Sequence, residues 1–172
     1  IGNALVQQAQ QREVLPDPGA ALIIGVDIAR YGDDATVFCF RQGRDARSIP
    51  AIRYTGRDNM FIANELAKVM DRFHPQAVNI DAGNGMGVID RLRELGYKVH
   101  EVWFGSSAFS PEWANRRTEM WADLRDWLGG GALPLDPILF GDLTAPEYRP
   151  FGKASDKTML QSKEELKQLG YR

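Results

Sequence analysis

Cysteine and histidine are scarce in this sequence, and their scarcity removes several kinds of chemistry. The 172 residues include one cysteine, Cys39, and two histidines, His74 and His100. A single thiol forms no internal disulfide and supplies too few ligands for a cysteine-based zinc site. Neither histidine has a partner at metal-ligand spacing, and no serine–histidine or cysteine–histidine arrangement indicates a nucleophilic hydrolase.

Long apolar runs, a strong excess of charge and a nucleotide-binding loop are also missing. No apolar run approaches membrane-spanning length, and no signal peptide is recognisable, so we expect no membrane partner. The formal net charge is only −2, which means that any nucleic-acid contact must come from a local patch. The glycine-rich run at 83–87 lacks the lysine and hydroxyl residue of a P-loop, and no Walker motif occurs elsewhere. We therefore expect no nucleotide in this domain.

The length and ordinary hydrophobic content indicate one globular domain with a sizeable core. Residues 1–20 are interpreted as a short helix followed by a Pro- and Gly-containing interdomain linker, and residues 21–172 as the domain itself. The chain begins at Ile1 and ends at Arg172 without an obvious closing element. We expect it to be a piece of a longer polypeptide, truncated before its last helix.

The periodicity of apolar residues predicts an α/β fold. Strands are expected at 22–27, 35–40, 49–54, 77–81 and 99–104. Helices are expected at 58–73, 88–95, 113–128, 136–145 and 162–169, and the run 83–87 is read as a loop. The first three strands are too closely spaced for anything but an antiparallel meander, whereas helical crossovers make the later strands parallel to the first. The prediction is a mixed sheet of about five strands with helices on both faces.

Two of the predicted strands end in a carboxylate. Asp27 ends the first strand and Asp81 ends the fourth, and in such a sheet these strands can be neighbours with their carboxyl ends on one edge. Each aspartate alone is explained equally well as a turn or cap residue. Two carboxylates held side by side repel each other, and a divalent cation offsets that cost. The pair predicts a site for Mg²⁺ or Mn²⁺, with two ions suited to phosphodiester hydrolysis.

Other charged residues are weaker candidates. Asp33 and Asp34 follow the first strand and are expected either to be solvated or to support the metal site. Basic side chains near the first hairpin are expected to contact the DNA backbone if they do not simply face solvent. These basic candidates are Arg30, Arg41, Arg44 and Arg47.

Several motifs resemble the nuclease domain of the large terminase subunit of tailed phages or prophages. The run 23–34, IIGVDIARYGDD, resembles the opening of that domain. Ile80 and Asp81 before a glycine-rich turn resemble its second acidic position, and 115–117, NRR, before a Trp-containing helix resembles its middle. The segment 160–167, LQSKEELK, resembles the approach to its last helix. The resemblance covers nearly the whole chain.

This resemblance implies a ribonuclease H-like fold and a Mg²⁺- or Mn²⁺-dependent endonuclease that cleaves concatemeric viral DNA during packaging in the host cytoplasm. It implies that Asp27 and Asp81 are the first two catalytic, metal-binding carboxylates. The third carboxylate of the family would lie beyond Arg172, so activity of this chain is expected to be weak or absent without it. The implied partners are double-stranded DNA, the terminase ATPase domain, the small subunit and the portal.

Two alternatives remain open at this point. Another ribonuclease H-like nuclease, such as a junction resolvase, would use the same acidic edge on a different substrate. A non-catalytic packaging or docking module would carry the acidic edge for structural reasons only. Replacing the two aspartates separates the enzymes from the docking module.

Overall fold

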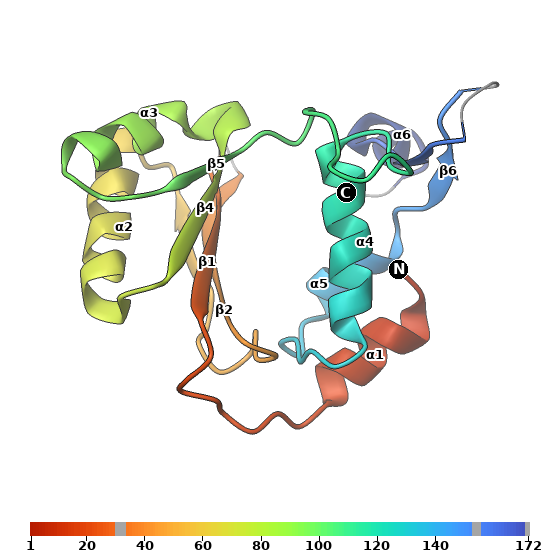
Figure 1. The fold of residues 1–172 in the computed structure, drawn as a ribbon, viewed down its shortest axis with the longest axis horizontal. Helices are drawn as coiled ribbons and strands as arrows, with labels where there is room; N and C mark the ends of the chain where they lie inside the picture. Colours follow the sequence, from red (N-terminus) through yellow and green to blue (C-terminus); the bar gives the residue numbers. More distant parts are fainter. Residues whose placement is uncertain (30–33, 153–155, 171–172) are drawn as a thin grey trace. The chain divides into compact units, whose positions relative to one another are not determined.

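The computed structural model of the chain describes residues 1–29, 34–152 and 156–170, which form two compact units. The sheet unit comprises Leu15–Trp103, and the helical unit comprises Ile1–Val14 together with Phe104–Arg172. Each unit brings its own segments together, as the ribbon in Figure 1 shows. None of the helices in the described ranges is both long and apolar enough to cross a bilayer.

The sheet unit contains a five-stranded mixed sheet in the order β3-β2-β1-β4-β5. Its strands are β1 Leu22–Asp27, β2 Ala35–Gln42, β3 Ile52–Thr55, β4 Ala77–Asp81 and β5 His100–Val102. β1, β2 and β3 pair antiparallel, and β4 and β5 continue the sheet parallel to β1. The predicted fold class, an antiparallel meander followed by parallel strands, is confirmed. β3 and β5 are shorter than the expected 49–54 and 99–104.

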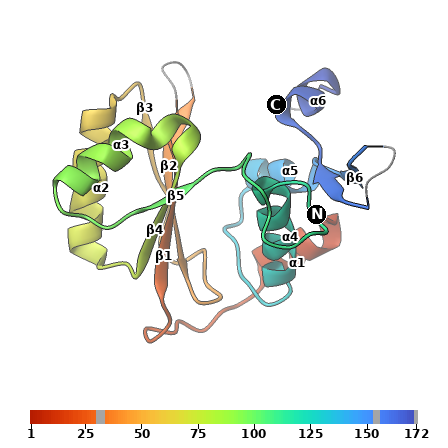
Figure 2. The ribbon, with the colours of Figure 1, turned by 45° about the horizontal axis from the view of Figure 1, so that its top comes forward.

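Two helices, α2 Asn59–Phe73 and α3 Ala82–Glu94, pack on one face of this sheet (Figures 1 and 2). Alternate strand residues form the core beneath them, among them Ile24, Phe38 and Ile80, each fully buried. Burying a large apolar side chain stabilises the fold by about 1.5–3 kcal/mol. The apolar residues of each strand therefore point toward the helices. The intervening strand residues therefore lie on the opposite face.

The glycine-rich run at 83–87 is not a loop, and this prediction was wrong. α3 begins at Ala82, directly after β4, so the glycines form the first turns of the helix. A Cβ on Gly85 would lie 2.9 Å from Cγ2 of Ile80 and 3.3 Å from Cγ1 of Ile28. The missing side chain lets the helix approach the sheet closely, and this packing outweighs the poor intrinsic helix propensity of glycine.

The helical unit packs a short N-terminal helix against segments from the other end of the chain. It contains α1 Asn3–Gln11, α4 Arg116–Leu128, α5 Pro137–Thr144, β6 Tyr148–Pro150, β7 Thr158–Leu160 and α6 Lys163–Gln168. α1 contacts α4 and α5 (Figure 2). Its Val6 and Ala9 are fully buried. The Gln10 side-chain amide donates to the carbonyls of Pro134 and Asp136 at 3.0 and 2.8 Å. These contacts hold residues 3–11 in a defined position within the helical unit.

Side-chain caps set the boundaries of the helices. Asp58 caps α2 by accepting from the amide of Phe61 at 2.8 Å, as the sequence predicts. Asn115 caps α4 by accepting from the amide of Thr118 at 2.9 Å, which is why this helix begins at Arg116 and not at residue 113. The two-stranded sheet of β6 and β7 was not predicted from the sequence.

Candidate metal and DNA site

The carboxylates of Asp27 and Asp81 occupy equivalent places at the carboxyl ends of two neighbouring parallel strands. β1 and β4 are paired through Val26 and Ile80, and each aspartate follows directly. Parallel strands in register direct matched side chains to the same face of the sheet, and their backbones lie about 4.8 Å apart. Both aspartates therefore project from the face that α2 and α3 do not cover.

Buried neighbours fix the direction of each aspartate. Asp27 stands between Val26 and Ile28, whose exposed fractions are 5% and 2%. Asp81 stands between Ile80 and Ala82, which are 0% and 1% exposed. Rotating either strand end to hide a carboxylate would bring these apolar neighbours into water, so the two charges stay on the outer face.

Asp81 also begins α3. One of its oxygens, Oδ1, accepts a hydrogen bond from the amide of Gly83 at 2.9 Å. The interpretation of this residue as a cap is therefore correct, but it does not exclude a second role. A carboxylate has two oxygens and about four lone-pair sites, so capping leaves acceptor capacity for a cation. Asp27 is exposed and Asp81 is partly exposed, and carboxylate oxygens suit a hard divalent ion such as Mg²⁺ or Mn²⁺.

A row of matched residues crosses the whole sheet at the level of the two aspartates. Asp27 is paired with Val37 of β2, Val37 with Arg53 of β3, and Asp81 with Val102 of β5. Matched residues share a face, so Arg53 lies on the same face as the carboxylates.

Sequence reasoning missed Arg53, although its strand was predicted. The signal was available in the alternation along β3, where Ile52 and Tyr54 pack against the core and Arg53 between them is exposed. The Tyr54 ring contacts Phe38 and Phe61 edge-on, which anchors the helix-covered face. The pairing of β3 with β1 through β2, which aligns Arg53 with Asp27, cannot be read from local periodicity.

The pKa of the Cys39 thiol depends on charged groups on this face of the sheet. It is paired with Gly25, two residues before Asp27 on β1. Burial raises the pKa of the Cys39 thiol, the nearby Arg53 guanidinium lowers it, and the Asp27 carboxylate raises it. The thiol is therefore influenced by both the arginine and the aspartate of the row.

The other acidic candidates are only partly described. Asp33 and Arg30 lie outside the described residues. Asp34 is exposed and directly precedes β2, which puts it at the same end of the sheet as Asp27 because β1 and β2 run antiparallel. No group of three or more histidine, cysteine, aspartate or glutamate side chains with metal-binding geometry occurs among residues 1–29, 34–152 and 156–170.

The basic residues of the first hairpin lie at the opposite end of the sheet. Arg41 of β2 is paired with Ile23 near the start of β1, whereas Val37 is paired with Asp27. Four residues of strand separate these two pairs, a distance of about 14 Å. Arg44 and Arg47 follow in the turn beyond β2, so the structure does not bring them to the carboxylate pair.

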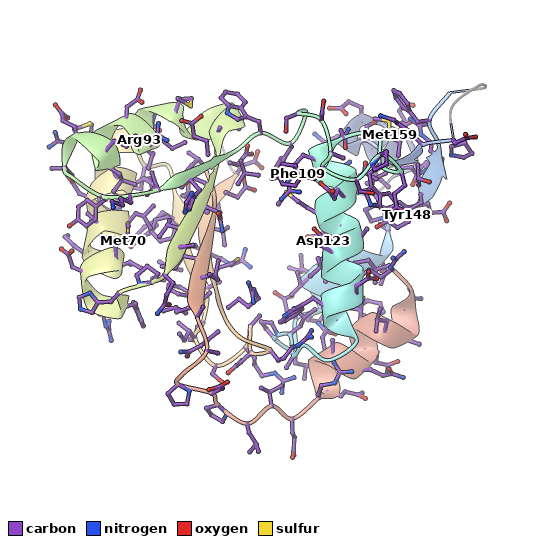
Figure 3. All side chains as sticks on the ribbon, viewed as in Figure 1. Met70, Arg93, Phe109, Asp123, Tyr148 and Met159 are labelled. Carbon is purple, nitrogen blue, oxygen red and sulfur yellow. The ribbon has the colours of Figure 1, made fainter. Side chains whose placement is uncertain are left out.

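The stretch at 115–117 in the helical unit has a structural explanation. The buried Glu119 carboxylate accepts from the amides of Phe109 and Ser110, at 3.0 and 2.8 Å, and from the Arg116 guanidinium at 2.5 Å. The Phe109 amide, the Ser110 amide and Arg116 together lower the pKa of Glu119. Arg116 also lies over the ring of Phe109. Figure 3 labels Phe109 beside the start of α4. This cluster fastens the segment before α4.

Arg117 also forms its contact within the helical unit. Its guanidinium donates to the carbonyl of Gln161 at 2.8 Å. The hydroxyl of Thr118 accepts from the amide of Leu160 at 3.1 Å, which ties β7 to α4. Asn115, Arg116 and Arg117 thus cap and fasten the helix, and these contacts account for the motif without a DNA ligand.

Solved structures share this fold. The nuclease domain of the large terminase subunit gp2 of bacterial virus Sf6 superposes with a TM-score of 0.75 at 18% identity, over 99% of this chain and 91% of that one. The large terminase nuclease from thermophilic phage G20c gives a TM-score of 0.62 at 16% identity, over 86% and 75% of the two chains. Similar structures include a point mutant of the Sf6 domain with manganese and the G20c nuclease with magnesium. The sequence matches no protein-family model and no curated protein.

These similarities confirm the resemblance found in the motifs at the level of the fold. The fold, with its five-stranded sheet of antiparallel and then parallel strands, is shared with the nuclease domain of the Sf6 large terminase subunit.

Proposed function

We propose that this chain is the metal-dependent DNA endonuclease domain of a phage large terminase subunit, which cleaves concatemeric viral DNA during packaging in the host cytoplasm. The nuclease domain is proposed as 21–172, and α1 of the preceding residues 1–20 packs against its α4 and α5. The observation that carries the proposal is the register of β1 and β4, whose last residues are both aspartates on one face of the sheet. The fold shared with the Sf6 and G20c nucleases, and the manganese and magnesium in structures of those proteins, support it.

In this proposal the carboxylate oxygens of Asp27 and Asp81 bind Mg²⁺ or Mn²⁺. Asp33 and Asp34 have supporting roles. Two bound ions would supply an activated water and stabilise the leaving oxygen of the phosphodiester. The strands hold both carboxylates at a fixed spacing before substrate arrives, so little reorganisation is needed when DNA binds. Partners of the longer protein would be the terminase ATPase domain, the small subunit and the portal.

Asparagine substitutions at the two positions test the proposal. Asp27→Asn and Asp81→Asn each remove a charge and a metal ligand but keep the size of the side chain. Asparagine is as good a helix cap as aspartate, so Asp81→Asn should retain the bond from the Gly83 amide and the start of α3. In a chain extended past Arg172, we expect both variants to keep their melting temperature and to nick supercoiled plasmid in Mn²⁺ more than about a hundredfold more slowly.

The matched control is Asp90→Asn, the same chemical change at an exposed position of α3. It should cut at the rate of the unmodified chain. Calorimetric titration with Mn²⁺ provides a readout that does not depend on turnover, and binding should weaken in the first two variants only. Cutting by both asparagine variants at the unmodified rate would exclude the carboxylate pair from the mechanism. A four-way junction tested beside the plasmid distinguishes a resolvase.

A further inference from the structure

The row of residues that contains the two aspartates also contains one cation. Arg53 lies two strands from Asp27, on the same face and at the same level of the sheet. Two strand spacings correspond to about 10 Å between the backbones. Val37 lies between them in the matched row, so no charged side chain of that row separates Arg53 from Asp27.

Arg53 is available to a ligand. Its side chain is exposed, and with the residues that the structure describes its guanidinium forms no hydrogen bond or ion pair. Other arginines of the sheet unit have partners, such as Arg93, which pairs with Glu101 at 2.6 Å; Figure 3 labels Arg93 on α3. The opposing effects of Arg53 and Asp27 on the pKa of the Cys39 thiol support their proximity on one face.

We propose that Arg53 binds a DNA phosphate next to the one that lies at Asp27 and Asp81. This inference rests on the proposed nuclease function and adds a substrate-positioning residue to it. A DNA strand that crosses the ends of β1 and β4 at a right angle to them continues over β2 and β3, where the guanidinium can hold a phosphate in a bidentate manner.

Substitution of Arg53 in the full chain tests this contact. We would compare Arg53→Ala, Arg53→Lys and the control Arg72→Ala, which removes the same charge from an exposed position on α2, the layer on the other face. Binding to a fluorescein-labelled 25-bp duplex is followed by anisotropy in Ca²⁺ at several salt concentrations. Plasmid nicking in Mn²⁺ and the melting temperature are measured on the same samples.

Arg53→Ala should weaken duplex binding about tenfold and reduce the slope of log K against log salt by about 0.9, the value for one phosphate contact. Arg53→Lys should keep the slope because its charge still displaces a counterion, while losing part of the affinity with the bidentate geometry. Arg72→Ala should leave the slope unchanged, although it removes the stacking of Arg72 on the Phe73 ring. Arg53→Ala and Arg53→Lys should melt at the temperature of the unmodified chain. A merely structural role would shift the melting temperature and leave the slope intact.

An unchanged slope in Arg53→Ala would overturn the inference, as would an equal change of slope in Arg72→Ala. Unchanged duplex binding with an altered Mn²⁺ requirement would also overturn it, and would make Arg53 a counter-charge to Asp27. The two proposals fail separately. Full cutting by Asp27→Asn refutes the nuclease site but leaves the salt slope as a test of Arg53, whereas inactive aspartate variants with an unchanged Arg53→Ala slope refute only the phosphate contact.

Discussion

Replacing Gly85 by alanine should destabilise the chain, although the same change in most helices is stabilising. Gly85 is buried in α3, and an added Cβ would lie 2.9 Å from Cγ2 of Ile80 and 3.3 Å from Cγ1 of Ile28. Both isoleucines are at most 2% exposed, so neither has room to move. Overpacking of this kind costs about 1–3 kcal/mol, while the gain in helix propensity is about 1 kcal/mol. The net loss is about 1 kcal/mol, or a fall of about 2–4 °C in melting temperature.

Gly87→Ala is the matched control in the same helix. Its Cβ would lie 2.6 Å from Nδ2 of Asn59, but that contact is with the end of an exposed side chain that can rotate away. The helix-propensity gain then dominates, and the melting temperature should rise by about 2 °C. Hydrogen exchange of the α3 amides gives the local stability that a melting curve averages over the molecule.

The Gly85 substitution should also impair the candidate site. Ile28 follows Asp27 and Ile80 precedes Asp81, so relief of the new contact displaces the backbone next to both carboxylates. Misplacement by about 1 Å can cost about a hundredfold in rate. We therefore expect Gly85→Ala, fully folded at 25 °C, to nick plasmid more slowly than Gly87→Ala. If Gly85→Ala were stabilised as much as Gly87→Ala, close packing of α3 would not explain the glycine, and the reasoning would be refuted.

Two further predictions concern pH and salt. The amides of Phe109 and Ser110 lower the pKa of Glu119, so its stabilising contribution is present above the ordinary glutamate pKa of about 4.3 and is lost as pH falls through the lower folded value. Glu119→Gln should therefore lower the melting temperature more at pH 7 than at pH 3; an equal loss at both would contradict this. If the hairpin turn contacts DNA, the double change Arg44→Ala with Arg47→Ala should reduce the salt slope of duplex binding by about 1.8, without slowing cleavage of saturating DNA. An unaltered slope would remove the hairpin from the DNA surface.

The positions of the strand ends could be read from the sequence because they depend on local alternation. Asp27 lies between two apolar residues that must be buried, and so does Asp81, which fixes the direction of both carboxylates once the strands are recognised. The antiparallel and parallel directions of the strands followed from the lengths of their connections. These are rules about neighbouring residues, and they held.

Features that depend on distant partners could not be read in this way. The glycine-rich composition of the first turns of α3 disfavours a helix, and the close approach to Ile28 and Ile80 explains why a helix forms there. β6 and β7 have three residues each and are defined by pairing with each other. The alignment of Arg53 with Asp27 requires two successive strand pairings, each set by long-range contacts.

The effects of Asp81 on stability and on the proposed metal binding can be separated, because its carboxylate has two oxygens and only one of them caps α3. Oδ1 is occupied by the amide of Gly83 and sets the start of α3, a role that needs an acceptor atom but no charge. Metal binding beside Asp27 needs the negative charge and the remaining oxygen lone pairs. Asparagine keeps the first role and loses the second, whereas alanine loses both and adds a capping penalty of about 1 kcal/mol. A residue that served only as a cap would tolerate asparagine without any effect on catalysis, so the asparagine variant, and not the alanine variant, decides whether this strand end is a metal site.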